Sequence, residues 1–290
     1  MREHRITANG IDITVAIGGD GPALLLLHGF PHTWRLWSAV IPHLTPHHRV
    51  IAPDLRGLGA TTRADGGYDA GTLADDAEAL LDALGEPAAT VAGIDAGAPP
   101  AFLLALRRPE RVHRLVLMES LLGRLPGAED FLAGGPPWWF GFHAVPGLAE
   151  TVLAGHEEDY IGWFLDAGTR RGVPPELRAR FVAAYTGRDA LRCAFAHYRA
   201  MPESARQIAE AVSAARLTVP TVAIGAHPVG DALARQLRPV TDVLESHVLD
   251  DCRHLIPLDR PDALVPLLRS GSSRSAGRAG EGHVRDAARR

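Results

Sequence analysis

Lysine is absent from this chain, cysteine occurs only twice, and no apolar run is long enough to cross a membrane. All 30 basic residues are therefore arginine, and with 34 acidic residues the net charge is −4. The chain has no long basic run, which argues against nucleic acid as a partner. A membrane helix needs about 20 consecutive apolar residues, so we expect no membrane partner.

The cysteines and the first residues exclude further classes. Cys193 and Cys252 are too few for a disulfide framework, and their spacing suits no zinc site. Residues 1–10 lack the apolar core of a signal peptide. We therefore expect a cytoplasmic protein without a metal site. Its 290 residues, 46% of them apolar, are enough for one large domain or for one domain with an insertion.

Segments typical of strands and helices alternate along residues 1–120. Two alternating segments meet at Asn9-Gly10, which is a strong hairpin signal. Continuous apolar runs predict strands buried on both faces at residues 23–29, 49–57, 89–95 and 112–120. Helical spacing predicts helices over residues 34–44, 72–85 and 99–110, the second with Thr72 as N-cap and Gly85 at its end. This alternation indicates an α/β fold, with a parallel sheet wound with helices.

The alternation breaks at about residue 121. The following segment is rich in Gly, Pro and aromatic residues, and no convincing strand occurs up to about residue 205. Strands and helices resume at residues 217–225, 231–240, 245–251 and 260–270. We therefore predict an α/β core formed by residues 1–120 and 205–268, interrupted by a helical insertion at residues 121–204. Residues 269–290 are rich in Gly, Ser and Arg without apolar periodicity, which predicts a disordered tail.

A single carboxylate, Asp95, ends the strand predicted at residues 89–95. Gly93 and Gly97 stand two residues before and two residues after it. A polar residue between small residues, at a turn from strand to helix, is typical of a nucleophile elbow, whose strained backbone projects the side chain above the sheet. The usual nucleophile is Ser, whereas an Asp in its place attacks carbon and forms an ester with the substrate. The simpler alternative is that Asp95 only caps the following helix.

Other motifs occur in order around this elbow: HGFP at 28–31, APDLRGLG at 52–59, LVLMES at 115–120 and CRH at 252–254. In these motifs the chain resembles the α/β-hydrolase superfamily, in its branch of epoxide hydrolases and haloalkane dehalogenases. The resemblance implies an α/β-hydrolase fold, with a mostly parallel sheet flanked by helices. It also implies that residues 121–204 form a helical cap, or lid, over the site.

The resemblance assigns roles to the HGFP loop. In the family this loop supplies one backbone N–H of an oxyanion hole, which maps to Phe30. The residue after the nucleophile, Ala96, supplies the other, and the two donors stabilise the charge that develops on the Asp95 ester. His28 and Pro31, from the same loop, are expected at the substrate site.

The resemblance also assigns the residues that complete a catalytic triad with Asp95. His254 is expected to be the base that activates water, because imidazole titrates near neutral pH. Arg253 before it stands where the family commonly has Gly. Relatives place the acid that orients the histidine after either of two strands, which leaves Glu119 as the favoured candidate and Asp231 as the alternative. With Glu119, the chain order is nucleophile, acid, base, as the fold requires.

A cap tyrosine donates a hydrogen bond to the epoxide oxygen in family members. Residues 194–203, AFAHYRAMPE, resemble the motif that carries it, and the tyrosine maps to Tyr198. Some relatives pair this tyrosine with a His in a segment similar to residues 136–147, where this chain has Trp139 beside Trp138. An indole N–H can donate but cannot titrate. Both tryptophans are expected at the substrate site, although packing alone explains them equally well.

The residues after the nucleophile separate the candidate reactions. Haloalkane dehalogenases usually have Trp directly after the nucleophile, where this chain has Ala96. Fluoroacetate-type enzymes have arginines just beyond, where this chain has Ala98, Pro99 and Pro100. A serine esterase needs Ser at the elbow. We therefore expect an epoxide hydrolase that forms a vicinal diol through an ester on Asp95, without a metal or an organic cofactor.

The expected partner is a small-molecule epoxide. Aromatic residues in the predicted cap favour a bulky or aromatic epoxide, such as a natural product of bacterial secondary metabolism, and a homodimer is left open. Three residues depart from the family pattern: Ile94 replaces the usual His, Ala96 the usual Trp or small polar residue, and Arg253 the usual Gly. Two alternatives follow, a haloalkane dehalogenase-type hydrolase and a hydrolase-fold protein that binds a ligand without turnover. Retention of all four predicted catalytic residues argues against the second.

Overall fold

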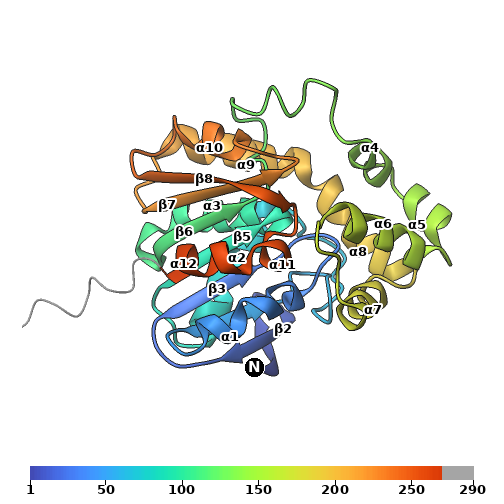
Figure 1. Ribbon diagram of the computed structural model, residues 1–290, viewed down its shortest axis with the longest axis horizontal. Coiled ribbons are helices and arrows are strands. Elements are labelled where there is room, and N and C mark those ends of the chain that lie inside the picture. Colours follow the sequence, from blue (N-terminus) through green and yellow to red (C-terminus); the bar gives the residue numbers. More distant parts are fainter. Residues whose placement is uncertain (270–290) are drawn as a thin grey trace, which may run out of the picture.

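An eight-stranded sheet runs through the middle of the protein, with helices on both of its faces (Figure 1). The computed structural model describes residues 1–269. The strand order is β1-β2-β4-β3-β5-β6-β7-β8. The pairs β1–β2 and β2–β4 are antiparallel, and the other neighbouring strands of this sheet pair in parallel. The sheet therefore has the mostly parallel α/β architecture that the sequence predicts.

The strands are β1 (Arg2–Ala8), β2 (Ile11–Gly18), β3 (Ala23–Leu27), β4 (Arg49–Pro53), β5 (Ala89–Ile94), β6 (Val112–Met118), β7 (Thr221–His227) and β8 (Leu244–Arg253). The helices of the core are α1 (Ile41–Leu44), α2 (Ala70–Ala83), α3 (Ala98–Arg107), α9 (Met201–Ala214), α10 (Ala232–Leu237), α11 (Ile256–Asp259) and α12 (Pro261–Arg269). Between β6 and β7 the insertion adds α4 (Trp138–Ala144), α5 (Leu148–Leu153), α6 (Glu157–Ala167), α7 (Pro175–Ala184) and α8 (Arg188–Arg199).

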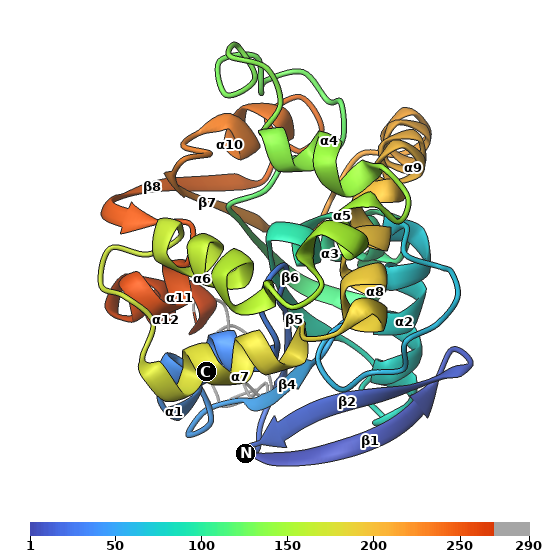
Figure 2. The ribbon, with the colours of Figure 1, turned by 90° about the vertical axis from the view of Figure 1, so that its right-hand side faces the viewer.

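The central strands are apolar because both of their faces are covered. All five residues of β3, ALLLL, are buried, as expected for a parallel strand between two helical layers. Helices α1 and α12 pack together on one side of the sheet, and α2 and α3 pack together on the other (Figure 2). The helix predicted over residues 34–44 is instead a 3₁₀ turn, Trp34–Ala39, followed by α1. Pro42 lies in the first turn of α1, where its missing N–H removes no intrahelical bond.

Of three local predictions, the hairpin turn and the helix-ending glycine are confirmed, and the N-cap residue is wrong. Asn9 and Gly10 join β1 to β2 with φ of 46° and 74°, the left-handed backbone that a tight hairpin turn requires. Gly85 follows α2 with φ of 71°, as a helix-ending glycine does. The N-cap of α2 is Asp69 rather than Thr72, because its side chain accepts the backbone N–H of Thr72 at 3.0 Å.

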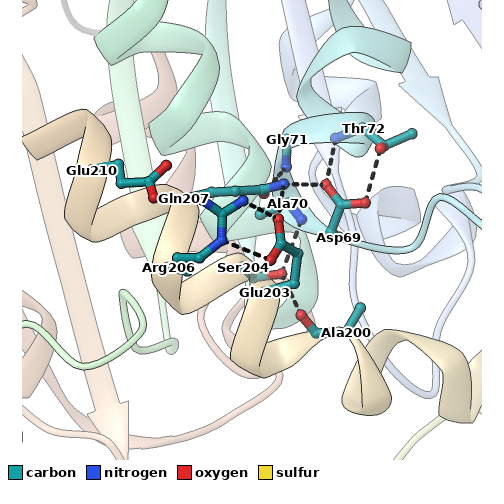
Figure 3. A network of polar contacts seen from close by, with 10 residues as sticks. All are labelled: Asp69, Ala70, Gly71, Thr72, Ala200, Glu203, Ser204, Arg206, Gln207 and Glu210. Atoms are coloured by element: carbon teal, nitrogen blue, oxygen red, sulfur yellow. Dashed lines mark hydrogen bonds and ion pairs between the residues drawn. The ribbon is translucent and has the colours of Figure 1, made fainter.

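The helical insertion lies beside the sheet, at the end where β5 and β6 terminate (Figure 1). The predicted boundary between residues 204 and 205 falls inside α9, which packs against α2 and α3 of the core. Ser204 and Gln207 of α9 accept the backbone N–H groups of Ala70 and Gly71 at 3.0 and 2.8 Å, so α9 helps to cap α2 (Figure 3). The chain thus returns to the core at the start of α9.

The remaining predictions about the chain concern its cysteines, its tail and membrane spans. Cys193 and Cys252 are both buried and unpaired. Among the helices of residues 1–269, none combines the length and apolar character needed to cross a membrane. Arg269 ends α12, and the rest of the predicted tail, residues 270–290, lies outside the described residues.

Candidate active site

The turn that follows β5 places Asp95 in a strained backbone conformation. Its φ is 53°, which non-glycine residues rarely adopt, and Asp95 begins a 3₁₀ turn that leads directly into α3. A Cβ atom on Gly93 would lie 2.3 Å from the carbonyl oxygen of Gly97. A Cβ atom on Gly97 would lie 2.5 Å from the carbonyl oxygen of Leu27. Small residues on both sides of Asp95 are therefore a steric requirement of this turn.

The Asp95 carboxylate is held by the HGFP loop. Its Oδ1 accepts the backbone N–H of Phe30 at 2.8 Å, and the side chain remains 26% exposed. Burial would raise the pKa of Asp95, but the hydrogen bond and charge of His254 and the backbone N–H groups of Phe30 and Ala96 lower it below the ordinary value. A Cβ atom on Gly29 would lie 2.2 Å from Oδ1, so this approach requires glycine. The carboxylate is thus ionised and faces two backbone donors.

His254 lies between two carboxylates. It directly follows β8, and its Nε2 is 3.4 Å from Oδ2 of Asp95, while its Nδ1 is 3.3 Å from Oε2 of Glu119. Burial would lower the pKa of His254, but the hydrogen bonds and negative charges of Asp95 and Glu119 outweigh it and raise the pKa to about 10. The imidazole is therefore protonated at neutral pH when both carboxylates are charged.

Glu119, and not Asp231, lies beside this histidine. Glu119 directly follows β6 with φ of 42°, is 1% exposed, and its Oε1 accepts the backbone N–H of Ala226 at 2.6 Å. The distant Asp231 pairs with Arg235 on the surface, with Nε 3.3 Å from Oδ1. Sequence spacing leaves both acids open, and the geometry brings only the first to His254.

Tyr198 differs from the other tyrosines because its hydroxyl has no hydrogen-bond partner among residues 1–269. Its ring centroid lies 5.7 Å from that of Phe30, and burial, with the charge of Asp95 as the next cause, raises its pKa well above the ordinary value. The hydroxyls of the other three tyrosines are hydrogen-bonded: Tyr68 to Ala64 at 2.5 Å, Tyr160 to His143 at 2.6 Å and Tyr185 to His32 at 2.6 Å. The Tyr198 hydroxyl makes no hydrogen bond within residues 1–269, so its proton is uncommitted.

The two predicted tryptophans do not accompany Tyr198. Trp138 is 55% exposed and contacts the rings of Trp139 and Trp163, so the structure does not bring it to Asp95. Trp139 packs on Phe164 with ring centroids 5.4 Å apart. It is therefore separated from Phe30 by another ring, because Phe164 contacts Phe30 at 5.3 Å.

His143 is a residue that the sequence analysis missed. It is fully buried, and its ring centroid lies 4.4 Å from that of Tyr198 and 4.1 Å from that of Phe195. Burial lowers its pKa to about 3, and the charge of Arg199 adds to the effect. The sequence feature that could have pointed to His143 is its place one helical turn after Trp139, on the same face of α4.

The histidine of the HGFP motif, His28, makes hydrogen bonds that hold the surrounding loops together. His28 is fully buried; its Nδ1 contacts the carbonyl oxygen of Gly29 at 2.8 Å and its Nε2 accepts the backbone N–H of Leu55 at 3.2 Å. Burial lowers its pKa to about 4. With both nitrogens used, His28 holds the loop in place, and its expected contact with the substrate stays a prediction. Pro31 is buried directly after Phe30. No group of three or more His, Cys, Asp or Glu within residues 1–269 could hold a metal ion.

Comparisons with known proteins show the family of the chain. Residues 22–166 match the model of a family described as the alpha/beta hydrolase fold. A soluble epoxide hydrolase of Corynebacterium sp. (strain C12) is 28% identical over 283 residues, which cover 91% of this chain and 95% of that protein. A fluoroacetate dehalogenase of Burkholderia sp is 34% identical over 211 residues, covering 68% and 69%. The solved structure of the epoxide hydrolase CorEH without ligand has a TM-score of 0.83 at 27% identity, covering 92% of this chain and 96% of that one.

Proposed function

Because the chain belongs to the α/β-hydrolase superfamily, in its epoxide hydrolase branch, we propose that this hydrolase opens an epoxide to a vicinal diol through an ester on Asp95. One observation carries the proposal. The carboxylate of Asp95 has one oxygen on the backbone N–H of Phe30 and the other 3.4 Å from His254. A nucleophile, an oxyanion donor and a base then meet at a single carboxyl group.

In the first step, Asp95 attacks a carbon of the epoxide and the ring C–O bond breaks. The lowered pKa of Asp95 supports this role, because only the ionised carboxylate is a nucleophile. Tyr198 donates a hydrogen bond and then its proton to the oxygen that leaves the ring, which its uncommitted hydroxyl permits. An alkyl ester of Asp95 with one free hydroxyl is the product of this step.

In the second step, water hydrolyses the ester. Esterification removes the charge of Asp95, which is one of the two charges that raise the pKa of His254. The pKa of His254 therefore falls, the ring releases its extra proton to solvent, and the neutral imidazole then takes a proton from water while Glu119 keeps the ring oriented. The oxygen of water attacks Cγ of Asp95, and the N–H groups of Phe30 and Ala96 stabilise the oxyanion. The diol leaves with the proton from His254, the proton released when Asp95 ionises restores Tyr198, and His254 regains a proton from solvent once the charge of Asp95 has returned.

The helical insertion acts as a cap in this proposal. Rings from three of its helices and from the residue that follows α7 surround Phe30, with centroids 5.3 to 6.2 Å away: His143, Phe164, Tyr185, Phe195 and Tyr198. A cover of rings excludes water from the ester until hydrolysis and favours apolar substrates. We therefore propose a bulky or aromatic, uncharged epoxide as the substrate class.

Carbon–halogen hydrolysis is the second candidate function. The same nucleophile and base would serve it, and the 34% identity to a fluoroacetate dehalogenase favours it. The residues after the nucleophile argue against it, because Ala96, Ala98, Pro99 and Pro100 offer no side-chain donor to a halide or a carboxylate.

The test uses the variant His254→Gln, which should form the ester but not hydrolyse it. Incubated with styrene oxide, this variant should gain the mass of one substrate on Asp95, as read by intact-protein and peptide mass spectrometry. Parallel incubations with a haloalkane and with fluoroacetate test the second candidate function. Wild-type protein should turn over styrene oxide to the diol, and Asp95→Ala should not. Binding of epoxides without any adduct, or diol formation by Asp95→Ala, would refute the proposal.

A further inference from the structure

His32 is a buried histidine that the two steps above do not use. The residue is 0% exposed, and neither ring nitrogen has a hydrogen-bond partner among residues 1–269. The carbonyl oxygen of Gly29 acts weakly on the pKa of the ring, but it does not reach hydrogen-bond geometry. Buried polar groups in proteins are nearly always hydrogen-bonded, so an unpartnered imidazole in this position requires an explanation.

The His32 ring lies beside that of the proposed base. Its centroid is 6.4 Å from that of His254, with 32° between the ring planes, and the ring of Phe181 lies on it at 5.6 Å. The backbone of His32 is fixed, because its N–H donates to the carbonyl of Gly29 at 3.0 Å and its carbonyl accepts the Tyr185 hydroxyl at 2.6 Å. The loop that carries the oxyanion donor therefore also holds this ring in one place.

The charges of Asp95 and His254 also affect the pKa of His32. Burial lowers the pKa of His32 to about 3, while the charge of Asp95 acts to raise it and that of His254 to lower it further. At neutral pH the ring is uncharged and carries one donor and one acceptor.

We propose that His32 is a positioning residue for the hydrolytic water: its ring hydrogen-bonds the water molecule that His254 deprotonates and directs the oxygen of that water toward Cγ of the Asp95 ester. The inference rests on the proposed function. In this step water gives a proton to Nε2 of His254, its oxygen forms a bond to Cγ, and the bond from Cγ to the substrate oxygen breaks. That oxygen then takes the proton from His254. His32 forms and breaks no covalent bond.

The test measures ester formation and ester decay separately. His32→Leu removes both ring nitrogens, His32→Gln keeps a donor and an acceptor, and His32→Phe replaces the Leu variant if that variant does not fold. Phe181→Leu is the matched control, because it alters the packing on the ring and leaves the nitrogens. Rapid-quench mass spectrometry with styrene oxide follows the adduct on Asp95 in each protein.

We expect His32→Leu to form the ester within about twofold of the wild-type rate and to hydrolyse it about 10- to 100-fold more slowly. Its kcat and KM should fall together, so that kcat/KM is unchanged. His32→Gln should recover most of the decay rate, and Phe181→Leu should keep it. Unchanged decay in His32→Leu, or equal slowing of both steps, overturns the inference and leaves the proposed function standing. Absence of any adduct in both wild type and His254→Gln overturns the two together.

Discussion

The backbone N–H of Arg253 donates a hydrogen bond of 2.9 Å to the side-chain carboxylate of Asp259. Asp259 is fully buried and also accepts the backbone N–H groups of Arg170 and Arg171, at 3.0 and 3.1 Å. One carboxylate therefore ties the residue before His254 to the loop between α6 and α7 of the insertion. The Arg253 guanidinium donates to the carbonyl oxygen of Ala167 at 3.1 Å, so this departure from the family's usual Gly serves the same junction.

Asp259→Asn should loosen the segment that carries His254. Burial would raise the pKa of Asp259, but hydrogen bonds from Thr169 and from the N–H groups of Arg170, Arg253 and Arg171 lower it. Its contribution to stability is therefore present above the ordinary aspartate pKa and is lost as the pH falls below it. We expect a loss of about 2–4 kcal/mol in the free energy of unfolding at pH 7, measured by urea denaturation.

Asp262→Asn is the control for this substitution. Asp262 lies on the exposed side of α12, and within the described residues 1–269 its only ion pair is with Arg260, at 3.2 Å. A surface pair of this kind contributes about 0–1 kcal/mol. Equal losses in the two variants would mean that the junction at Asp259 has no special importance for stability.

Tyr198→Phe should slow ring opening, because it removes the one uncommitted phenol near Phe30. We expect kcat/KM for styrene oxide to fall about 10²- to 10³-fold, with the stability of the fold nearly unchanged. Tyr185→Phe is the matched control, since its hydroxyl donates to the carbonyl of His32 and not to a substrate. That variant should lose stability rather than the ring-opening rate. The proposed donor would be wrong if both variants kept wild-type kcat/KM.

The pKa of His254 should depend on the charge of Asp95. In the free protein it is raised to about 10, and Asp95→Asn removes one of the two responsible charges. NMR titration of the imidazole should show a lower pKa in that variant than in wild type. Because the folded-state pKa lies above the ordinary value, the protonated ring stabilises the fold below about pH 6.5. That contribution is lost as the pH rises toward 10, and the unfolding free energy of wild type should decline over this range more steeply than that of Asp95→Asn.

Gly29→Ala should remove activity without unfolding the protein. The added Cβ would lie 2.2 Å from Oδ1 of Asp95 and 2.7 Å from the backbone nitrogen of Ala96, so the oxyanion hole has to open. Loss of such a donor reduces kcat by about 10²- to 10³-fold. Gly66→Ala is the control, because no atom lies within 4 Å of its added Cβ. A Gly29→Ala variant with normal turnover would contradict the assigned hole.

Gln207→Ala should weaken the junction where α9 rejoins the core. The Gln207 amide accepts the N–H of Gly71 at 2.8 Å and donates to Asp69 at 2.7 Å (Figure 3). Removing a helix cap costs about 1–2 kcal/mol. Within residues 1–269, its neighbour Arg206 forms ion pairs only with exposed acids on the same helix, so Arg206→Ala should cost much less stability than Gln207→Ala. Thermal unfolding of the two variants provides the comparison, and a larger loss for Arg206→Ala would contradict this assignment.

Much of this site was predictable because parallel strands end at one edge of a sheet. Asp95 follows β5, Glu119 follows β6 and His254 follows β8, so apolar runs and turn residues place these side chains near one another. The small residues around Asp95 likewise mark a tight turn in the sequence. These features depend on local backbone preference and on burial, which sequence patterns record directly.

Long-range hydrogen bonding decided the rest. The local sequence does not indicate that both nitrogens of His28 are hydrogen-bonded to backbone groups, or that Asp69 rather than Thr72 caps α2. It also does not indicate that the Tyr198 hydroxyl makes no hydrogen bond within residues 1–269. Nor does it reveal that His32 is buried beside His254 without a hydrogen-bond partner among residues 1–269. The sequence by itself determined the order of strands and helices and the position of the proposed nucleophile. Only the tertiary structure decided which polar atoms remain available for chemistry, because their partners come from segments far apart in the chain.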